Sequence, residues 1–383
     1  MIISFRRITS SCNFIPEIDG LRFIAIVSVV LFHLSGFIMA KDSREYTEVV
    51  NYSFFQHFLS HGHLGVPLFF VISGFILGLP FAKYHVLKKS PVSLRQYFSR
   101  RLTRLEPPYI LVMTVLLFGA VFVAKTVSLN DGLLSYFSSL IYSHNLLYLG
   151  TIPSLNSSTW SLEVEVQFYI LAPLMAYMFS LKNPFTRRIV LFLATIILLV
   201  ISQLHPFPFL SIINFCHYFL TGFVLTDLYV SRKTLFSKTK FDWLIGIFLF
   251  IIMWLFDEKD FNYDYERVLW ETIQLSSIFL FFYYVLFHDI FKFLSWKPIT
   301  NIGGMCYSIY LLHYPIISMI GNPLLKYSFS KYAFLNVSIY SIIIISIIMT
   351  VSSLFFLLIE RPCMDKNWYK RFKKPSLLRN TAQ

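Results

Sequence analysis

The chain of 383 residues has little charge and little cysteine. Charged residues make up 14% of it, against about 25% in a typical soluble domain, and apolar residues make up 56%. This balance excludes an ordinary soluble enzyme and a disordered chain. The four cysteines (Cys12, Cys216, Cys306 and Cys363) show no paired spacing. We therefore expect neither disulfides nor a metal site built on cysteine.

Acidic residues are also scarce relative to basic ones. There are 33 Lys and Arg against 20 Asp and Glu, which gives a formal net charge of +13. A basic excess is typical of nucleic-acid-binding proteins, where the cations gather on one soluble face. Here the basic residues fall in separate short segments between apolar stretches. We therefore expect no nucleic-acid partner.

Long apolar runs dominate what is present. A helix needs about 20 mostly apolar residues to cross a bilayer. The sequence predicts an all-α, polytopic bundle of about ten transmembrane helices. The segment 132–150 is less apolar and has Leu133 and Phe137 at helical spacing with serines between them, so it is either an amphipathic or re-entrant helix or an eleventh span. The ten predicted spans are 21–40, 64–82, 105–124, 159–180, 188–204, 210–230, 242–256, 268–289, 302–322 and 334–359.

The distribution of Lys and Arg predicts the orientation of this bundle. With the N-terminus in the cytoplasm, the inner segments hold 25 basic residues and the outer segments hold 7, and the remaining one is Arg22 at the start of the first span. The positive-inside rule therefore places both termini in the cytoplasm. Residues 1–19 contain no apolar core, so we expect no cleavable signal peptide. We divide the chain into a cytoplasmic segment (1–19), a membrane domain (20–360) and a basic cytoplasmic tail (361–383).

Two ionisable residues share one face of the first predicted span. Arg22 and His33 are eleven positions apart, which leaves about 20° between them around a helix and about 16 Å along it. Ionisable groups inside a membrane are costly and mark functional sites. The alternatives are a snorkelling anchor for Arg22 and a structural role for His33. Asp19 precedes the apolar run, and we interpret it as the helix cap.

A second basic cluster follows the second span. Arg101 and Arg104 are three residues apart and lie on one face of a helix that enters the membrane. Pro107 and Pro108 follow within a turn, where we expect them to bend or break the helix. The arginines either anchor the helix at the inner surface or bind a polyanionic ligand, since Arg holds phosphate in a bidentate manner.

Two glutamates lie near the outer end of the fourth predicted span. Glu163 and Glu165 are two positions apart and point in nearly opposite directions on a helix, so they do not form a carboxylate pair. Glu165 lies deeper and is the better functional candidate.

The ninth predicted span places three further polar residues in the membrane. Tyr307, Tyr310 and His313 either form hydrogen bonds between helices or belong to a site. His61 and His63 form an HGH sequence in an outer loop, but two ligands do not make a metal site, and we expect no metal.

Taken together, these motifs resemble acyltransferase family 3, the integral-membrane O-acyltransferases of surface glycans. The resemblance covers nearly the whole chain, and six individually weak motifs occur in the order typical of the family. They are the Arg-x10-His pattern of Arg22 and His33, GVPLFFVISGFIL from Gly65 to Leu77, the pair Arg101 and Arg104, WSLEVEVQFY from Trp160 to Tyr169, CYSIYLLHYP with His313, and Glu360-Arg361-Pro362.

The resemblance implies a donor, a reaction and a location. The donor is acyl-CoA, usually acetyl-CoA, which enters from the cytoplasm as a substrate; no cofactor is permanently bound. The acceptor is a lipid-linked or lipid-anchored glycan such as lipopolysaccharide O-antigen, capsule or exopolysaccharide. The protein would lie in a bacterial inner membrane. A transporter of a small anion or acyl group is the alternative, because intramembrane ionisable groups also serve such paths.

The resemblance also assigns roles to residues. Arg22, Arg101 and Arg104 would bind the phosphates of coenzyme A. His33 would act as general base on the acceptor hydroxyl or carry the acyl group, and its ordinary pKa of about 6.5 suits a base near neutral pH. Glu165 is a second catalytic candidate that would orient the imidazole, bind the acceptor sugar or stabilise the imidazolium. The remaining candidates are structural or line the substrate: Asp19, Trp160, Ser161, Tyr169, Tyr307, Tyr310 and His313.

Two positions depart from the family pattern. Val166 stands where many relatives have a second Glu, and Cys306 replaces the commoner Ser before Tyr307.

Overall fold

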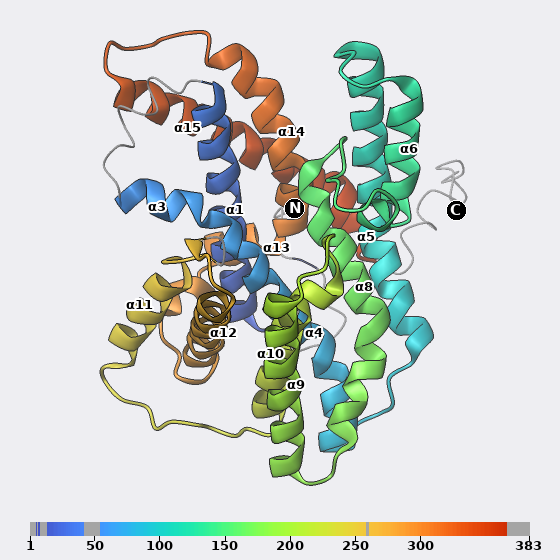
Figure 1. Ribbon diagram of the computed structural model, residues 1–383, viewed down its shortest axis with the longest axis vertical. Coiled ribbons are helices and arrows are strands. Elements are labelled where there is room, and N and C mark those ends of the chain that lie inside the picture. Colours follow the sequence, from blue (N-terminus) through green and yellow to red (C-terminus); the bar gives the residue numbers. More distant parts are fainter. Residues whose placement is uncertain (1–4, 6, 8–13, 42–53, 258–259, 366–383) are drawn as a thin grey trace, which may run out of the picture.

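A computed structural model describes residues 5, 7, 14–41, 54–257 and 260–365, and every element within these ranges is a helix (Figure 1). The all-α fold class is therefore confirmed. Cys12, most of the N-terminal segment and the tail beyond residue 365 lie outside the described residues. Described Cys216, Cys306 and Cys363 are buried free thiols.

In the part of the chain that the structure describes, seven helices are long and apolar enough to cross a membrane. The three other predicted spans are also helical, but they are not among these seven. They are α10 (Ile212–Val230), α14 (Cys306–Leu324) and α11 (Asp242–Met253), the last with only 12 residues. The chain is thus a polytopic membrane protein, while the count of ten spans and the orientation stay predictions. The seven are Pro16–Lys41 (α1), Gly62–Leu87 (η1 and α4), Leu94–Val123 (α5 and a π-helical turn), Ser157–Ser180 (α8 with its 3-10 ends), Pro184–Leu204 (α9), Asp264–Phe287 (α12) and Ala333–Cys363 (α15 and its extension).

Helix ends follow the local sequence. The Ser93 side chain accepts a bond from the Gln96 amide at the start of α5 (Leu94–Phe118), which satisfies a free N–H of the first turn. The helix then runs through Pro107 and Pro108 without a break, so of the two expected effects, a bend or a break, the break is wrong. Membrane helices tolerate internal proline because surrounding groups satisfy the freed backbone.

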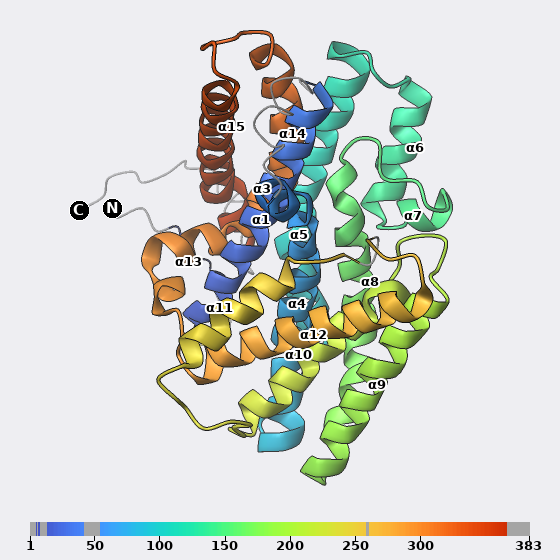
Figure 2. The same ribbon diagram turned by 60° about the vertical axis from the view of Figure 1, so that its left-hand side comes forward.

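The segment 132–150 does not form a span. It contains α6 (Leu129–Leu140), which is too short to cross a bilayer, and the single turn α7 (His144–Leu147). The serines of α6 are buried, whereas Phe137 faces outward with 61% exposure. The prediction of an amphipathic helix is confirmed, and its apolar side faces away from the protein. Figure 2 shows α6 beside α5.

The centre of the bundle depends on close helix contact. Helix α10 packs along α4 (Gly65–Leu87), and Gly74 and Gly222 lie where the two backbones meet. A methyl group on Gly74 would approach the Phe219 carbonyl oxygen to 2.1 Å. On the other side of α4 lies α1 (Pro16–Lys41), which also packs on α13 (Lys297–Gly304) and α14, while α14 packs on α15 (Ala333–Phe355).

Candidate functional site

A cavity of about 930 Å³ lies where helix ends from distant parts of the chain meet. Its wall includes the first half of α1, almost the whole length of α4 from Val66 to Lys83, the start of α5, the first half of α8 (Trp160–Met175) and the start of α14. Met364 and Asp365, which follow the last helix, also line it. The basic residues of the wall lie near the start of α1, the end of α4 and the start of α5, which the charge distribution predicts to be cytoplasmic, while Val66 and Ser161 lie toward the opposite ends of their helices.

The cavity wall carries a large excess of positive charge. Among the described residues, seven basic ones line it against two acidic ones, Glu165 and Asp365. Even when the two carboxylates behind the wall, Asp19 and Glu360, are included, the positive charges outnumber the negative ones. Such a concentration of guanidinium and ammonium groups in one enclosure favours a polyanionic ligand. The seven are Arg7, Arg22, Lys83, Lys89, Arg100, Arg101 and Arg104.

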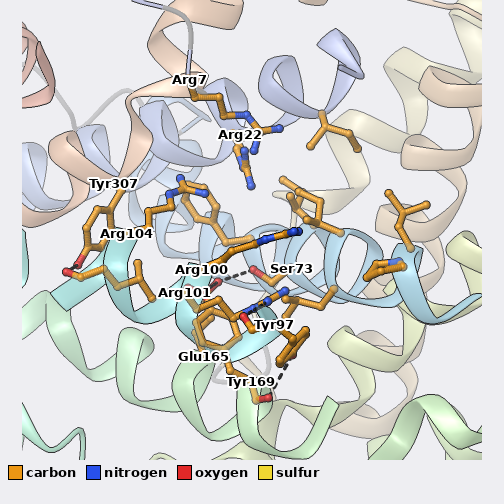
Figure 3. Close-up of a pocket in the computed structure, with 18 of the residues that line it drawn as sticks. Arg7, Arg22, Ser73, Tyr97, Arg100, Arg101, Arg104, Glu165, Tyr169 and Tyr307 are labelled. Atoms are coloured by element: carbon orange, nitrogen blue, oxygen red, sulfur yellow. Dashed lines mark hydrogen bonds between the residues drawn. The ribbon is translucent and has the colours of Figure 1, made fainter. Parts of the chain in front are cut away.

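Arg22 is held in place by Asp19. The Asp19 carboxylate is 1% exposed and accepts a bond from Arg22 at 2.9 Å while it pairs with Arg7 at 3.0 Å. Asp19 lies inside α1, which begins at Pro16, so its predicted role as the helix cap is wrong. Burial and the neighbouring Arg22 lower the pKa of Arg7 to about 9, so the Arg7 guanidinium is still charged near neutral pH. Figure 3 shows the two arginines together at one side of the cavity.

Arg101 is fixed by aromatic rings. Its guanidinium carbon lies 3.6 Å from the centre of the Tyr97 ring and 5.5 Å from that of Tyr169, and its Nη1 donates to the Tyr97 carbonyl at 2.7 Å. The Tyr97 hydroxyl in turn donates to the Tyr169 carbonyl at 3.1 Å (Figure 3). Planar stacking of this kind requires guanidinium and is not reproduced by a lysine.

Arg104 faces the end of the last long helix. Its Nη2 lies 3.7 Å from Oε1 of Glu360, which is fully buried. The other carboxylate oxygen of Glu360 accepts from the Ser308 amide at 3.1 Å and from its hydroxyl at 2.5 Å. The Nε of Arg104 is buried without a hydrogen-bond partner among the described residues. Arg104 thus retains a buried donor for a ligand.

The two glutamates of α8 have separate environments, as predicted. Glu165 lines the cavity and accepts hydrogen bonds of 2.6 Å from the hydroxyls of Ser73 and Tyr169. Glu163 is fully buried on another face of the helix. Its carboxylate accepts from the backbone amides of His144 and Asn145 at 3.2 and 3.0 Å, and so caps the turn α7.

Tyrosines from α14 complete the wall between α5 and α8. Tyr307 donates to the Leu105 carbonyl at 3.0 Å. Tyr310 donates to the Ser158 carbonyl at 2.6 Å, and its hydroxyl lies 3.1 Å from that of Ser161. Both tyrosines and Ser161 line the cavity.

Trp160 is not part of the cavity wall. It packs on Phe215 with ring centres 5.5 Å apart, and this contact joins α8 to α10.

His33 lies beyond the cavity wall. Val29 lines the cavity, and His33 follows it by one turn of α1 on nearly the same face, about 6 Å further along the helix. The ring centre of His33 is 5.2 Å from that of the fully buried His313 and 5.1 Å from that of Tyr314. The contacts of Glu165 run to Ser73 and Tyr169 and do not include either histidine among the described residues.

The structure thus brings together most of the predicted site residues. Arg22, Arg101, Arg104, Glu165 and Tyr169 line one cavity, with Ser161, Tyr307 and Tyr310. Asp19 lies behind Arg22, while His33, His313 and Trp160 lie outside the wall.

Some partners were missed from the sequence. Tyr97 precedes Arg101 by one helical turn, a spacing that could have indicated their contact. Ser73 is a polar residue inside an apolar span, which is a weaker signal. Arg7 and Lys89 carry no local pattern that separates them from ordinary surface cations, so only the fold reveals their place on the wall.

Comparisons with known proteins agree with this architecture. The sequence model of a family described as "Acyltransferase domain" matches residues 15–358. The chain is similar to O-acetyltransferase OatA of Staphylococcus aureus (strain NCTC 8325 / PS 47), with 29% identity over 344 residues, 82% of this chain and 52% of the relative. It is also similar to peptidoglycan O-acetyltransferase OatA of Listeria monocytogenes, with 27% identity over 337 residues, 81% of this chain and 50% of the relative.

A further relative is a putative O-acetyltransferase, SACOL0978, of Staphylococcus aureus (strain COL), with 25% identity over 344 residues, 80% of this chain and 51% of the relative. The chain therefore spans about half the length of the curated relatives it matches. No solved structure matches the chain.

Proposed function

Because the chain belongs to acyltransferase family 3, we propose that it transfers an acetyl group from cytoplasmic acetyl-CoA to a hydroxyl of a cell-surface glycan. The observation that carries the proposal is the cation-lined cavity at the predicted cytoplasmic ends of the helices. The cavity would bind the donor, and the region of His33 would hold the reacting groups.

The charge and the shape of the cavity support an acyl-CoA donor. Coenzyme A carries its phosphates at one end and a long, thin arm with the thioester at the other. The cations gather near the predicted inner mouth, where they would bind the phosphates through charge-assisted hydrogen bonds. Apolar side chains such as Val29, Val66 and Phe69 line the same cavity and would surround the uncharged arm.

In this proposal His33 acts as general base where the arm would end. It removes the proton from the acceptor hydroxyl, whose oxygen attacks the thioester carbonyl carbon. The carbon–sulfur bond then breaks, the sulfur leaves as the thiolate of coenzyme A, and the histidine returns the proton to that sulfur. The products are an O-acetyl ester and coenzyme A. A base in this position contributes about 10²- to 10⁴-fold in rate.

Cavity-wall residues would position the donor. Arg22 is held by Asp19 and Arg101 by Tyr97, so both guanidiniums are ordered before the donor binds. Glu165 holds the hydroxyls of Ser73 and Tyr169 and thereby supports the stack on Arg101. Preorganised cations bind phosphates at lower entropic cost than mobile ones.

The acceptor in this proposal is a surface glycan, and two kinds of surface glycan carry a suitable hydroxyl: peptidoglycan and a lipid-linked polysaccharide. The Listeria relative is named for peptidoglycan, which favours a hydroxyl of that polymer. A lipid-linked polysaccharide such as O-antigen or capsule presents the same kind of hydroxyl at the outer side of the membrane. The experiment below separates the two sources.

The test compares cells that express the wild-type chain, His33→Ala or no chain. O-acetyl esters are measured by NMR in separately purified peptidoglycan and polysaccharide, with immunoblots to confirm equal membrane levels. We expect esters in one fraction with the wild type and about 10²-fold fewer with His33→Ala. Wild-type ester content in the variant would contradict the catalytic role.

A second measurement separates the enzyme from a transporter. Inverted vesicles that contain the full chain receive acetyl-labelled acetyl-CoA, and the label is followed into glycan esters and into the vesicle lumen. Label in glycan esters is expected. Label that enters the lumen without any ester in either glycan fraction would overturn the proposal.

A further inference from the structure

His313 has a fixed hydrogen-bonding state. Its side chain is fully buried, and Nδ1 lies 3.1 Å from the Ile309 carbonyl oxygen and 2.8 Å from that of Tyr310. A carbonyl oxygen only accepts hydrogen bonds, so Nδ1 must carry the hydrogen. In a neutral imidazole the other nitrogen, Nε2, is then a lone-pair acceptor.

That acceptor has no partner among the described residues. Nε2 of His313 is buried, and no described donor reaches it. Buried polar atoms in native proteins are nearly always satisfied, and an exception calls for a functional explanation. Because Nδ1 faces the backbone of its own helix, Nε2 is turned toward the neighbouring elements.

The helix holds this histidine firmly. Pro315 lacks an N–H, so the Leu311 carbonyl has no donor from the next turn of α14. Asn156 donates to that carbonyl at 3.0 Å and so ties the segment before α8 to the turn that carries His313. The position of Nε2 is therefore defined by the bonds of Nδ1 and by the tie on the turn that carries the ring.

His33 is the neighbour that can donate a hydrogen bond to this acceptor. Helix α1 packs along α14, and the two imidazole centres are 5.2 Å apart with an angle of 46° between the rings. Nitrogens that face each other across such a separation lie about 3 Å apart, which is the length of a hydrogen bond. His33 is only partly buried, so its ring has room to turn.

We propose that His313 is a positioning residue for His33: its Nε2 accepts the imidazole N–H of His33 in the reacting state. The opposite nitrogen of His33 then carries no hydrogen and faces the acceptor hydroxyl. When that nitrogen takes the hydroxyl proton, the bond to His313 stabilises the imidazolium that forms. An orienting group beside a catalytic histidine has this same role. The inference rests on the proposed function, because it needs His33 to act as the base.

The test uses two amide side chains that reproduce different nitrogens of the imidazole. His313→Asn places an amide near the Nδ1 position and keeps the bonds to the helix carbonyls, but it removes the acceptor. His313→Gln reaches the Nε2 position and restores an acceptor through its amide oxygen. The full-length chain is purified in nanodiscs, and acetyl transfer from labelled acetyl-CoA to the glycan fraction identified above is measured.

We expect His313→Asn to lower kcat by about 10- to 100-fold, the range seen when the partner of a functional histidine is removed, with the KM for acetyl-CoA within about twofold of wild type. His313→Gln should recover a clear part of kcat. Equal losses in both variants, a wild-type kcat in His313→Asn, or a loss confined to KM would each overturn the inference.

His33→Ala keeps the two proposals distinguishable. If His33→Ala transfers acetyl groups at the wild-type rate, the proposed function fails as written and the role of His313 fails with it. If His33→Ala is inactive while His313→Asn matches the wild type in kcat and KM, only the inference about His313 fails. Thermal melting of each variant shows whether a loss of rate comes from misfolding.

Discussion

At the scale of single residues, the geometry of Arg101 separates the effect of charge from the effect of shape. Its guanidinium lies between two tyrosine rings and donates to a backbone carbonyl, so a lysine keeps the charge and loses these contacts. We expect Arg101→Lys to raise the KM for acetyl-CoA by about 10- to 100-fold, as the loss of a hydrogen bond to a charged group implies. Steady-state kinetics on the full-length chain measure this change.

Arg95 provides the matched control for Arg101. It lies on the same helix, α5, but is exposed and does not line the cavity. Arg95→Lys should leave the KM for acetyl-CoA within about twofold of wild type. An equal effect at both positions would mean that general surface charge, and not the stack on Tyr97, governs donor binding.

The two glutamates of α8 predict opposite phenotypes. Glu163 accepts amide hydrogens at the buried start of the turn α7, so Glu163→Gln should lower the stability by about 1–3 kcal/mol, seen as a lower Tm in detergent. Glu165 lines the cavity, so Glu165→Gln should lower acetyl transfer while the Tm changes little. A lower Tm in Glu165→Gln together with an unchanged Tm in Glu163→Gln would contradict this division.

At the scale of elements, the contact of α4 with α10 depends on the absence of a side chain at Gly74. A methyl group there would lie 2.1 Å from a backbone oxygen of α10, so the helices must move apart. We expect Gly74→Ala to destabilise the protein by about 1–3 kcal/mol, the usual cost of an overpacked interior. The Tm in detergent and the fraction of monodisperse protein report the loss.

Gly36 is the control for this substitution. It is a helical glycine of α1 with no atom within 4 Å of its would-be methyl group. Gly36→Ala should be neutral or slightly stabilising, since alanine favours a helix more than glycine does. A similar loss of Tm in both variants would point to a general effect of helix flexibility rather than to the close approach of α4 and α10.

At the scale of the whole molecule, the charge distribution predicts which ends of the helices meet the cytoplasm. We expect a cysteine at Lys233 to be protected from a membrane-impermeant maleimide in intact cells and a cysteine at Ser128 to be labelled. Both native side chains are exposed, and the three described native cysteines are buried. The reverse labelling pattern would invert the topology and place the cationic cavity at the outer surface.

Much of this architecture is readable from the sequence because membrane spans need long apolar helices, and long apolar runs are a strong signal. Arg22, Arg101 and Glu165 stand out for a related reason, since a charge in such a segment is costly. The wrong role for Asp19 came from the helix start, which lies at Pro16 rather than at the edge of the apolar run.

Other features depend on tertiary packing that a single sequence does not encode locally. The stack of Arg101 on Tyr169 joins residues from two helices, and Arg7 reaches the cavity from a segment before the first helix. The distance from Arg22 to His33 along α1 was predictable, but the end of the cavity wall at Val29, one turn before His33, was not.

The composition of the cavity wall also determines when the cavity can form during biosynthesis. Its wall takes Arg22 from the first helix, Tyr307 from α14 and Met364 from beyond the last helix. A nascent chain that has inserted only its early helices therefore lacks part of the enclosure. The complete cation-lined cavity therefore forms only after the last helix has been inserted, and a chain that is truncated before this helix would lack part of the wall.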